Sequence, residues 1–461
     1  MKNGKWIEYI FSFSFFVYSF FEAFFDLPSP ICAQIPDATQ QASTSTVDSS
    51  AVYVIGKIVV EGNKTTKSYI ILRELPFNRG DTVTVKDIDY ARDRIYSTSL
   101  FTKVLIQPEP VVNNKINLLI YVEERWYIWP YPVLGFRDRD LKKFYAGAGV
   151  VDLNFTGRSD RLAAMFGLGY DPFGAASYID PAIGDRREYI LSTGVSYSHG
   201  RNIGTQSGYS SGEFDDTFGD FYVYVGKRLG IYSVVSLQPS YNYVARNTSD
   251  STSAVLSPTD RDIFASLKFE YSFDSRDLKS YAMRGTYFDL SFEKNGLGES
   301  QIDFVRSFFD VREYLSLSDW LALVGRFHGD LAEGPQIPPY NHVFFGYYER
   351  IRGMFNTISE GESMLGGNVE LRIPIIRQLY FEIPDIPFRQ FISNRIALYW
   401  SFFGDFGETS NKYLALNLKS TLYGYGGGLT LLLPYDVILQ SDYARGSDRH
   451  SEFIFDFGEA I

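Results

Sequence analysis

The hydrophobic positions beyond about residue 125 recur mostly at every second residue, in short runs separated by polar or glycine-rich segments. This spacing is typical of β-strands, because successive side chains point to opposite faces of a sheet. The clearest runs are YFDLSF, FASLKFEYSF, DFYVYVGKRLG, NVELRIPI and RIALYWSFFGDFG. A stretch of roughly 335 residues, at about 21 residues per strand and its loop, has room for about 16 strands. An even number of strands, joined by tight turns and long polar loops, favours a closed antiparallel barrel in a membrane.

An array of soluble β-sandwiches is the alternative to a membrane barrel. Such an array would need several repeated cores with linkers between them, and the sequence shows neither. Beyond residue 34, no segment approaches 18 uninterrupted apolar residues, so a membrane would have to be crossed by strands.

Residues 52–124 follow a different pattern. The segment YVIGKIVVEGN reads as a strand that ends at Gly62. Two segments with helical spacing follow, TTKSYIILREL and the segment that contains Ile88, Ala91 and Ile95. The segments TKVLIQPEP and NKINLLIYVEE then read as two further strands. The predicted order is β-α-α-β-β within about 70 residues, which is enough for one small domain.

The N-terminal 33 residues read as a signal peptide. Two lysines precede the apolar run IFSFSFFVYSFFEAFF, and SPICAQIPDA offers a cleavage point after Ala33. A transmembrane helix is the alternative, although Glu22 lies inside the run. Residues 34–51 are rich in Ser, Thr and Gln, and we expect them to form a linker. Cys32 is the only cysteine, so the processed chain would have no disulfide and no cysteine-ligated metal.

Composition narrows the class of partner. The 461 residues are 45% hydrophobic and 17% aromatic, and the formal net charge is −11. An acidic chain without a basic block argues against nucleic acid as a partner. Tyr and Trp are abundant where barrel strands meet the membrane interfaces, so the aromatic content agrees with a barrel.

The alternation in NVELRIPI assigns side chains to the two faces of one predicted strand. Val369, Leu371 and Ile373 lie on one face, and Glu370 and Arg372 lie on the other. An apolar face can meet lipid. The face with Glu370 and Arg372 is therefore predicted to point into the barrel.

The same test on RIALYWSFFGDFG places a second carboxylate in the barrel. The side chains predicted to point outward are Ile396, Leu398, Trp400 and Phe402, and those predicted to point inward are Tyr399, Ser401, Phe403, Asp405 and Gly407. Arg352 lies in the loop before the first of these two strands, and a guanidinium can bind two carboxylates with its planar set of donors. Inward charges that are simply solvated by lumen water are the alternative interpretation.

Signals for an enzyme are weak. The four histidines, His199, His328, His342 and His450, are scattered without the spacing of metal ligands. The glycine-rich segment YGYGGGLTLLLP lacks the Lys-Ser/Thr of a phosphate-binding loop and reads as a strand. We therefore predict no enzymatic activity, no cofactor and no metal.

Several segments resemble those of a known family and occur in the family's order. Residues 52–124 resemble a POTRA domain through ILREL, GDTVTV and ARDRIYSTSLFTKVLI. Farther on, the segments VDLNFTGRSDRL, YIDPAIGD, FEYSFDSRD, RIRGM, GGNVELRIPI and FFGDFG are similar to barrel signatures. Together they resemble the BamA/TamA-like outer-membrane assembly superfamily, from about residue 52 to the end.

The resemblance implies roles for particular residues. It implies that Arg352 reaches into the barrel and pairs with Glu370 and Asp405. The other positions that match the family's motifs are Gly353, Asn154, Gly157, Arg158, Asp274, Arg276, Asp277, Gly366, Gly367 and Gly407. Two positions depart from the pattern, because Met354 and the C-terminal Ile461 stand where the family usually has aromatic residues.

The fold implied by the resemblance is one POTRA domain, residues 52–124, followed by a 16-stranded antiparallel transmembrane barrel, residues 125–461. The implied location is the outer membrane, with the POTRA domain in the periplasm. The implied function is assembly and insertion of outer-membrane proteins. The partners would be unfolded outer-membrane protein clients, outer-membrane lipids, and periplasmic chaperones or lipoproteins.

Two other functions remain open at the level of sequence. One is a polypeptide-secretion pore of the two-partner type, and the other is an accessory or structural barrel. Two-partner transporters typically have two POTRA domains and a preceding plug helix, and the predicted linker has no helical pattern.

Overall fold

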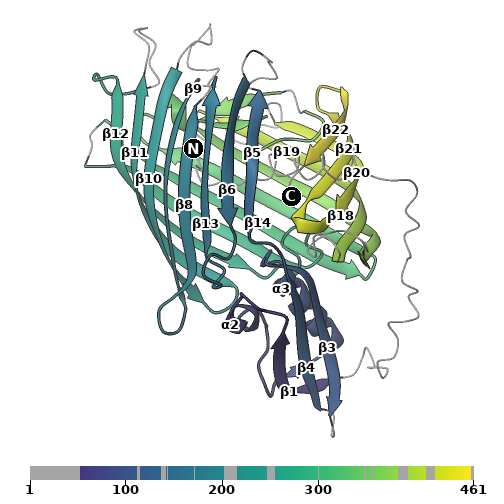
Figure 1. Cartoon of the computed structure of the whole chain (residues 1–461). Helices are drawn as coiled ribbons and strands as arrows, with labels where there is room; N and C mark the ends of the chain where they lie inside the picture. Colours follow the sequence, from purple (N-terminus) through teal and green to yellow (C-terminus); the bar gives the residue numbers. More distant parts are fainter. Residues whose placement is uncertain are drawn as a thin grey trace.

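The structure is a computed structural model that describes residues 52–457, except 112–114, 137–141, 143, 171, 202–214, 247–254, 299–300, 347–348, 355–356, 383–392 and 412–420. The predicted signal peptide, the predicted linker and Ile461 lie outside the described residues. The described residues form a small N-terminal domain below a large curved sheet (Figure 1).

The N-terminal domain contains two helices beside a mixed sheet. Its elements are β1 (Tyr53–Glu61), α2 (Ser68–Leu72), β2 (Thr82–Val83), α3 (Val85–Tyr96), β3 (Phe101–Val111) and β4 (Lys115–Glu124). In the described residues the sheet has four strands in the order β2-β1-β4-β3, and β1 is parallel to β4. The predicted β-α-α-β-β order is present, with the two-residue strand β2 as an addition. Strand β2 forms because the chain pairs Val83 with Tyr53 just before α3 begins.

Helix α3 begins at a capping box. The Thr84 hydroxyl accepts a hydrogen bond from the backbone N–H of Asp87, and the Asp87 carboxylate accepts one from the backbone N–H of Thr84. This exchange satisfies backbone donors that the first turn of a helix leaves unpaired. Ile88, Ala91 and Ile95 then lie on the buried face of the helix, as their spacing predicts.

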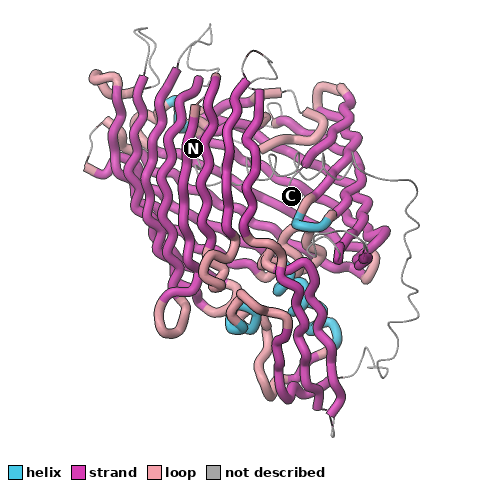
Figure 2. The backbone as a smooth tube through the Cα atoms, in the orientation of Figure 1, coloured by secondary structure: helices cyan, strands magenta, loops and turns pink. Residues whose placement is uncertain are grey.

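The large sheet is antiparallel, with consecutive strands as neighbours. In the described residues it has 16 strands, ordered from β5 to β22 along the chain, with β16 and β17 left out. The strands are β5 (Ile128–Phe136), β6 (Phe144–Asp152), β7 (Arg161–Gly169), β8 (Phe173–Ile183), β9 (Tyr189–Arg201), β10 (Asp215–Leu229), β11 (Ser233–Arg246), β12 (Arg261–Asp274), β13 (Gly285–Leu297), β14 (Phe304–Ser318), β15 (Leu321–Glu333), β18 (Ser363–Glu382), β19 (Ser393–Ser410), β20 (Leu422–Leu432), β21 (Ile438–Gly446) and β22 (Ser451–Phe457). They curl into a barrel (Figures 1 and 2), so the predicted fold class and strand number are confirmed.

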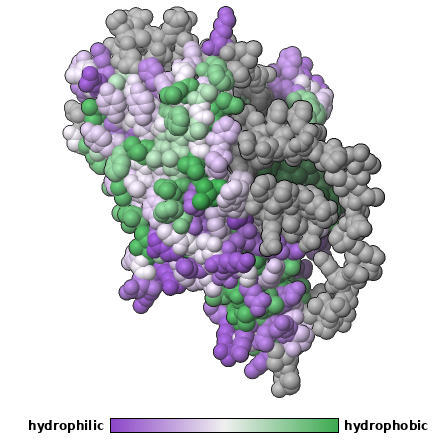
Figure 3. Space-filling model, viewed as in Figure 1, coloured by the Kyte–Doolittle hydropathy of each residue, from purple (hydrophilic) through white to green (hydrophobic). Residues whose placement is uncertain are grey.

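Side chains alternate between an apolar outer surface and a buried inner one. On β18, Val369 is 55% exposed and Leu371 is 38% exposed, whereas Glu370 and Arg372 are buried. On β19, Trp400 and Phe402 are exposed and Phe403 is buried. Apolar side chains gather on the visible wall of the barrel (Figure 3). Apolar-out alternation of this kind is the pattern of a barrel that faces lipid.

The connections on the side of the barrel away from the N-terminal domain include one long segment that matters for the site. Residues 334–362 join β15 to β18, and we call them the lumen loop. They include a 3-10 helix (Pro339–Asn341) and the short strands β16 (Val343–Phe345) and β17 (Ser359–Gly361). Among the described residues, no helix is both long and apolar enough to cross a membrane.

Loss of the helix cap should loosen the first turn of α3. Thr84→Ala removes the side-chain acceptor, and a lost N-cap costs about 1 kcal/mol. We expect amide hydrogen exchange to become about fivefold faster at Asp87 and Ile88. Hydrogen-exchange mass spectrometry of the full chain measures this, with Thr84→Ser, which keeps the hydroxyl, as the control. Equal exchange in the Thr84→Ala variant and the unmodified chain would contradict the assignment of the cap.

Candidate functional site

The lumen loop packs against the inner wall of the barrel. Tyr340 is buried, and its hydroxyl donates to Asp262 of β12 at 2.8 Å. The His342 ring nitrogen Nδ1 lies 2.7 Å from Glu360 Oε1, which joins the two ends of the loop. Between these anchors the loop brings Arg352 to the inward side chains of β18 and β19.

Arg352 forms a forked contact with two carboxylates. Its Nε and Nη2 donate to the two oxygens of Asp405, each at 2.8 Å, and its Nη1 donates to Glu370 Oε2 at 3.0 Å. The backbone N–H of Arg352 also donates to Asp405, at 3.0 Å. All three side chains are buried. A planar guanidinium can make these contacts at once, whereas a lysine ammonium offers a single point of charge.

Further charged and polar groups surround the fork. Arg372 Nε donates to the second oxygen of Glu370 at 2.8 Å, and the Tyr281 hydroxyl donates to the same oxygen at 3.3 Å. The Asn368 side chain donates to Asp405. Asp442 of β21 lies 3.7 Å from Arg352 Nη1. The buried carboxylates are thus opposed by two arginines and by neutral donors, as buried charges require.

An aromatic ring supports the guanidinium from one side. The central carbon of the Arg352 guanidinium lies 3.5 Å from the centroid of the Phe403 ring. A cation over the face of an aromatic ring is attracted to it, most strongly where water is excluded. Phe403 belongs to the inward row of β19 and is buried.

Two glycines let the arginine approach the wall. Gly353 has a φ of +91°, and a Cβ there would lie 2.7 Å from the carbonyl carbon of Arg445 on β21. A Cβ on Gly424 of β20 would lie 1.9 Å from the backbone oxygen of Arg352. Any larger residue at either position would push the loop away from β20 and β21.

The glycines of β18 and β19 make room for an aromatic ring of the lumen loop. A Cβ on Gly366 would lie 2.9 Å from the Phe345 ring, and one on Gly407 would lie 2.5 Å from it. Gly367 has the opposite orientation, and a Cβ there would meet the Phe406 ring at 2.6 Å. The inward-facing Gly366 and Gly407 therefore leave the space that the Phe345 ring of β16 occupies.

Met354 takes part in the packing of the loop. It is buried, and it joins a cluster with Phe345, Ile351 and Met364. Its sulfur lies 3.7 Å from the Ser447 hydroxyl, next to β21. A flexible thioether therefore fills the space in this chain.

A second charged cluster fastens the loop, and the sequence analysis missed it. Arg326 of β15 donates to both oxygens of Glu349, at 3.0 and 3.1 Å, and to Asp310 at 2.9 Å. Arg312 also donates to Asp310, at 2.8 Å. Strand parity could have placed Arg326 and Asp310 inside the barrel. Nothing in the local pattern around Glu349 indicates its partner.

The motif near the start of the barrel forms a turn under the N-terminal domain. The Asn154 side chain donates to the Thr66 hydroxyl at 3.0 Å, and the backbone oxygen of Gly157 accepts from the N–H of Lys67 at 2.9 Å. Arg158 lies in the same turn, and its guanidinium is 2.7 Å from Asp180 of β8. These residues therefore hold the N-terminal domain and lie apart from the Arg352 cluster.

The Asp-Ser-Arg-Asp motif forms a second contact with the N-terminal domain. Arg276 donates to both oxygens of Asp274, at 3.0 and 3.1 Å. Buried Arg94 of α3 donates to the backbone oxygen of Asp274 at 3.3 Å. The Ser97 hydroxyl at the end of α3 donates to the backbone oxygen of Asp277 at 3.3 Å.

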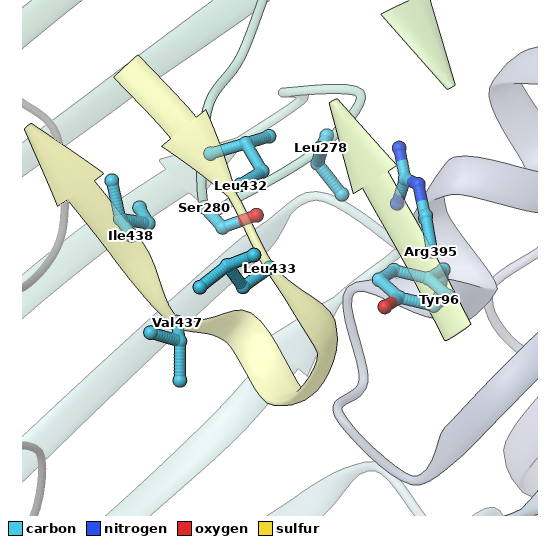
Figure 4. A pocket seen from close by; sticks show the side chains of 8 residues that line it. All are labelled: Tyr96, Leu278, Ser280, Arg395, Leu432, Leu433, Val437 and Ile438. Carbon is cyan, nitrogen blue, oxygen red and sulfur yellow. The ribbon is translucent and has the colours of Figure 1, made fainter. Parts of the chain in front are cut away.

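Apolar packing continues across the same boundary. Tyr96 of α3 lies beside Arg395 of β19, whose guanidinium carbon is 4.5 Å from the ring centroid (Figure 4). Leu278, Leu432 and Ile438 of the barrel surround this contact and belong to the same buried cluster as the core of the N-terminal domain. The domain is thus packed into the barrel mouth.

Asp277 is a titratable group in this boundary. Its Oδ1 accepts from the backbone N–H groups of Leu278, Met283 and Arg284, at 2.8, 3.1 and 3.4 Å. Burial, together with the nearby negative charge of Asp93 on α3, raises the pKa of the Asp277 carboxyl to about 6. Its backbone hydrogen bonds and Arg284 oppose this increase without cancelling it.

Removal of the guanidinium should release the lumen loop. Arg352→Ala leaves two buried carboxylates without their partner, which costs about 3–5 kcal/mol. We expect faster protease cleavage within residues 334–362 and barrel unfolding at a lower temperature, seen as an earlier loss of heat-modifiable gel mobility. Arg352→Lys should fall between the variant and the unmodified chain, and Arg449→Ala, at an exposed arginine, is the control. Unchanged cleavage and mobility in Arg352→Ala would contradict this role.

The contact between the two parts should depend on pH. The folded contact holds the Asp277 proton up to about pH 6, whereas an exposed aspartate loses it near 3.8. The contact should therefore be strongest below about pH 4 and weaken as the pH rises to about 6. Spin labels on exposed Lys57 and Asp185 should show a distance distribution that broadens from pH 4.5 to 7.5. Asp277→Asn should abolish this change, and the same broadening in that variant would show that another group is responsible.

Comparisons with known proteins agree with this architecture. A family model described as the Omp85 superfamily domain matches residues 154–461, and one described as POTRA, surface antigen variable number repeat, matches residues 53–125. No curated protein matches the chain in sequence.

Solved structures with a similar fold include those of two bacterial proteins. BamA from Haemophilus ducreyi lacking POTRA domains 1–3 is 16% identical with a TM-score of 0.50, and the match covers 88% of this chain and 84% of that one. CdiB from Escherichia coli is 11% identical with a TM-score of 0.51, and the match covers 88% of this chain and 74% of that one. At these identities the likeness shows the fold alone. Since the Omp85 model matches well over half of the residues, this chain belongs to the Omp85 superfamily and carries a POTRA domain.

Proposed function

We propose that the chain is an assembly and insertion factor for outer-membrane proteins. In this proposal residues 1–33 are a signal peptide, 34–51 a linker, 52–124 the POTRA domain in the periplasm, and 125–461 the barrel in the outer membrane. The POTRA domain receives an unfolded client, and the barrel promotes the entry of the client into the bilayer. No covalent bond is made or broken, so the chain is not an enzyme.

The observation that carries the proposal is the seam of the barrel. In the described residues every neighbouring pair from β5 to β22 is joined by a ladder, but β5 and β22 themselves are the two ends of the sheet and share none. Unpaired strand edges are templates for another strand. A client strand could therefore pair at the seam and leave sideways into lipid.

The contents of the barrel favour a sideways route over an axial one. The lumen loop is held inside by Arg352, Tyr340 and Glu349. The POTRA domain packs into the mouth through α3 and the turn at Asp277. A client that moved along the axis would have to break both sets of contacts.

The Arg352 cluster braces the part of the wall that leads to the seam. The arginine contacts Glu370 on β18, Asp405 on β19 and Asp442 on β21, and Gly424 places β20 against its backbone. These four strands directly precede β22 in the sheet. In the proposed mechanism the cluster keeps this side rigid while the seam opens.

An insertion assay tests the proposal. The purified chain in liposomes should insert an unfolded small barrel client several times faster than empty liposomes do. Arg352→Ala should lose much of this acceleration, and Arg449→Ala should keep it. No acceleration would indicate an accessory or structural barrel, and client protected inside the vesicles would indicate a secretion pore.

A further inference from the structure

The two edges of the seam differ in the hydrogen-bond donors that they can offer. Strand β5 has the sequence IWPYPVLGF, with Pro130 and Pro132 two residues apart. Proline has no backbone N–H and cannot donate to a ladder. The direction in which the backbone nitrogens of these two prolines point therefore decides which side of β5 lacks hydrogen-bond donors.

The ladder with β6 shows that the prolines face the seam. Residues Ile128 to Phe136 pair with β6 in an unbroken register, which includes Pro130 opposite Val150 and Pro132 opposite Ala148. Just before the strand, the backbone oxygen of Tyr127 accepts from the N–H of Leu153, so odd-numbered residues of β5 bond to β6. Even-numbered residues bond away from β6. The nitrogens of Pro130 and Pro132 therefore point to the free edge.

A proline inside the sheet behaves differently and supports this interpretation. At Pro239 of β11, the ladder with β10 passes from Ser240 to Leu237 and leaves the proline out. A proline that faces a neighbouring strand thus interrupts the ladder with that strand, and Pro130 and Pro132 interrupt none in the described sheet.

The edge of β22 keeps its donors. Just before β22, the backbone N–H of Gly446 donates to the backbone oxygen of His450 at 3.0 Å. The backbone groups of even-numbered residues of β22 therefore bond to β21. The backbone N–H groups of the odd-numbered residues point to the seam. These residues include Ser451, Phe453 and Phe455, and none of them is a proline. The side chains of Phe453 and Phe455 are exposed on the outer face, beside lipid in the proposed orientation.

We propose that β22 is the edge that hydrogen-bonds an incoming client strand, and that Pro130 and Pro132 keep β5 from pairing along its centre. This inference rests on the proposed function. The expected partner is an extended strand with apolar side chains at alternate positions, because these would continue the outer row of β22. Such a strand meets a continuous set of donors on β22, but on β5 it meets a gap of two adjacent donors.

The POTRA domain also has two prolines on an edge strand of its sheet. Strand β3 is the last strand of its sheet, and Pro108 and Pro110 pair with β4 in a register that is unbroken from Lys103 to Val111. Their missing donors therefore also fall on the free edge. This half of β3 is a poor template for a client strand, so strand addition to the β3 edge is confined to the part near Val104 and Ile106.

Cysteine cross-linking distinguishes the two edges of the seam. Single cysteines replace Leu134 on β5 or Phe453 on β22, both exposed, in a chain whose only natural cysteine, Cys32, is changed to Ser. The probe is an unfolded small outer-membrane barrel with single cysteines along its last strand. Ile128→Cys and Phe455→Cys repeat the comparison at a second depth, nearer the N-terminal domain. We expect at least fivefold more cross-linking to β22 than to β5.

Restoring the donors should change this preference. In Pro130→Thr/Pro132→Thr, the ratio of cross-linking to β5 over cross-linking to β22 should rise toward one, because β5 regains the two missing donors. Pro239→Thr, which restores a donor inside the sheet, should leave the β5 to β22 ratio unchanged. The gel mobility of an unheated sample, compared with that of a heated one, checks that each variant is folded.

The outcomes separate this inference from the proposed function. Equal or greater cross-linking to β5 in the unmodified chain, or no rise in Pro130→Thr/Pro132→Thr, would overturn the inference while accelerated insertion in liposomes could still stand. Cross-linking to neither edge, together with no acceleration, would overturn both.

Discussion

The buried fork of Arg352 between Glu370 and Asp405 is the contact on which the inner structure of the barrel depends. Two carboxylates within the inner wall are costly unless a cation meets them with good geometry. The guanidinium supplies that geometry, and Gly353 and Gly424 allow its backbone to come close enough. With Arg352 in this position, Met354 packs beside β21 and Phe345 lies over Gly366 and Gly407.

The two sides of the seam differ in the contacts that hold them and in the backbone donors that they offer. Strands β18 to β21 are tied together from inside by one loop, and β22 continues from them with its edge donors intact. Strand β5 follows the POTRA domain directly in the sequence. The nitrogens of its two prolines point toward the seam. A seam of this kind lacks the matched donors that would close it as an ordinary ladder.

Much of the fold could be predicted from the sequence. Alternation along β18 and β19 is a local property, and it correctly indicated which side chains face outward. Helical spacing and turn residues correctly indicated the N-terminal domain, although the short strand β2 has too few residues to leave a pattern. The contact of Arg326 with Glu349 could not be predicted, because Glu349 lies in a loop where no period applies. Likewise, nothing local indicated that the turns at Asn154 and Asp277 would meet Thr66 and Ser97.

The sequence by itself determined the face on which each strand residue lies, because side chains in a strand alternate with a period of two whatever the surroundings. It also determined where a donor is missing, because a proline lacks its N–H in any structure. The tertiary structure decided which inward charges meet, and whether a proline removes a bond from a ladder or from a free edge. Both depend on register and on the closure of the sheet, which bring together residues such as Arg352 and Asp405 that lie 53 positions apart.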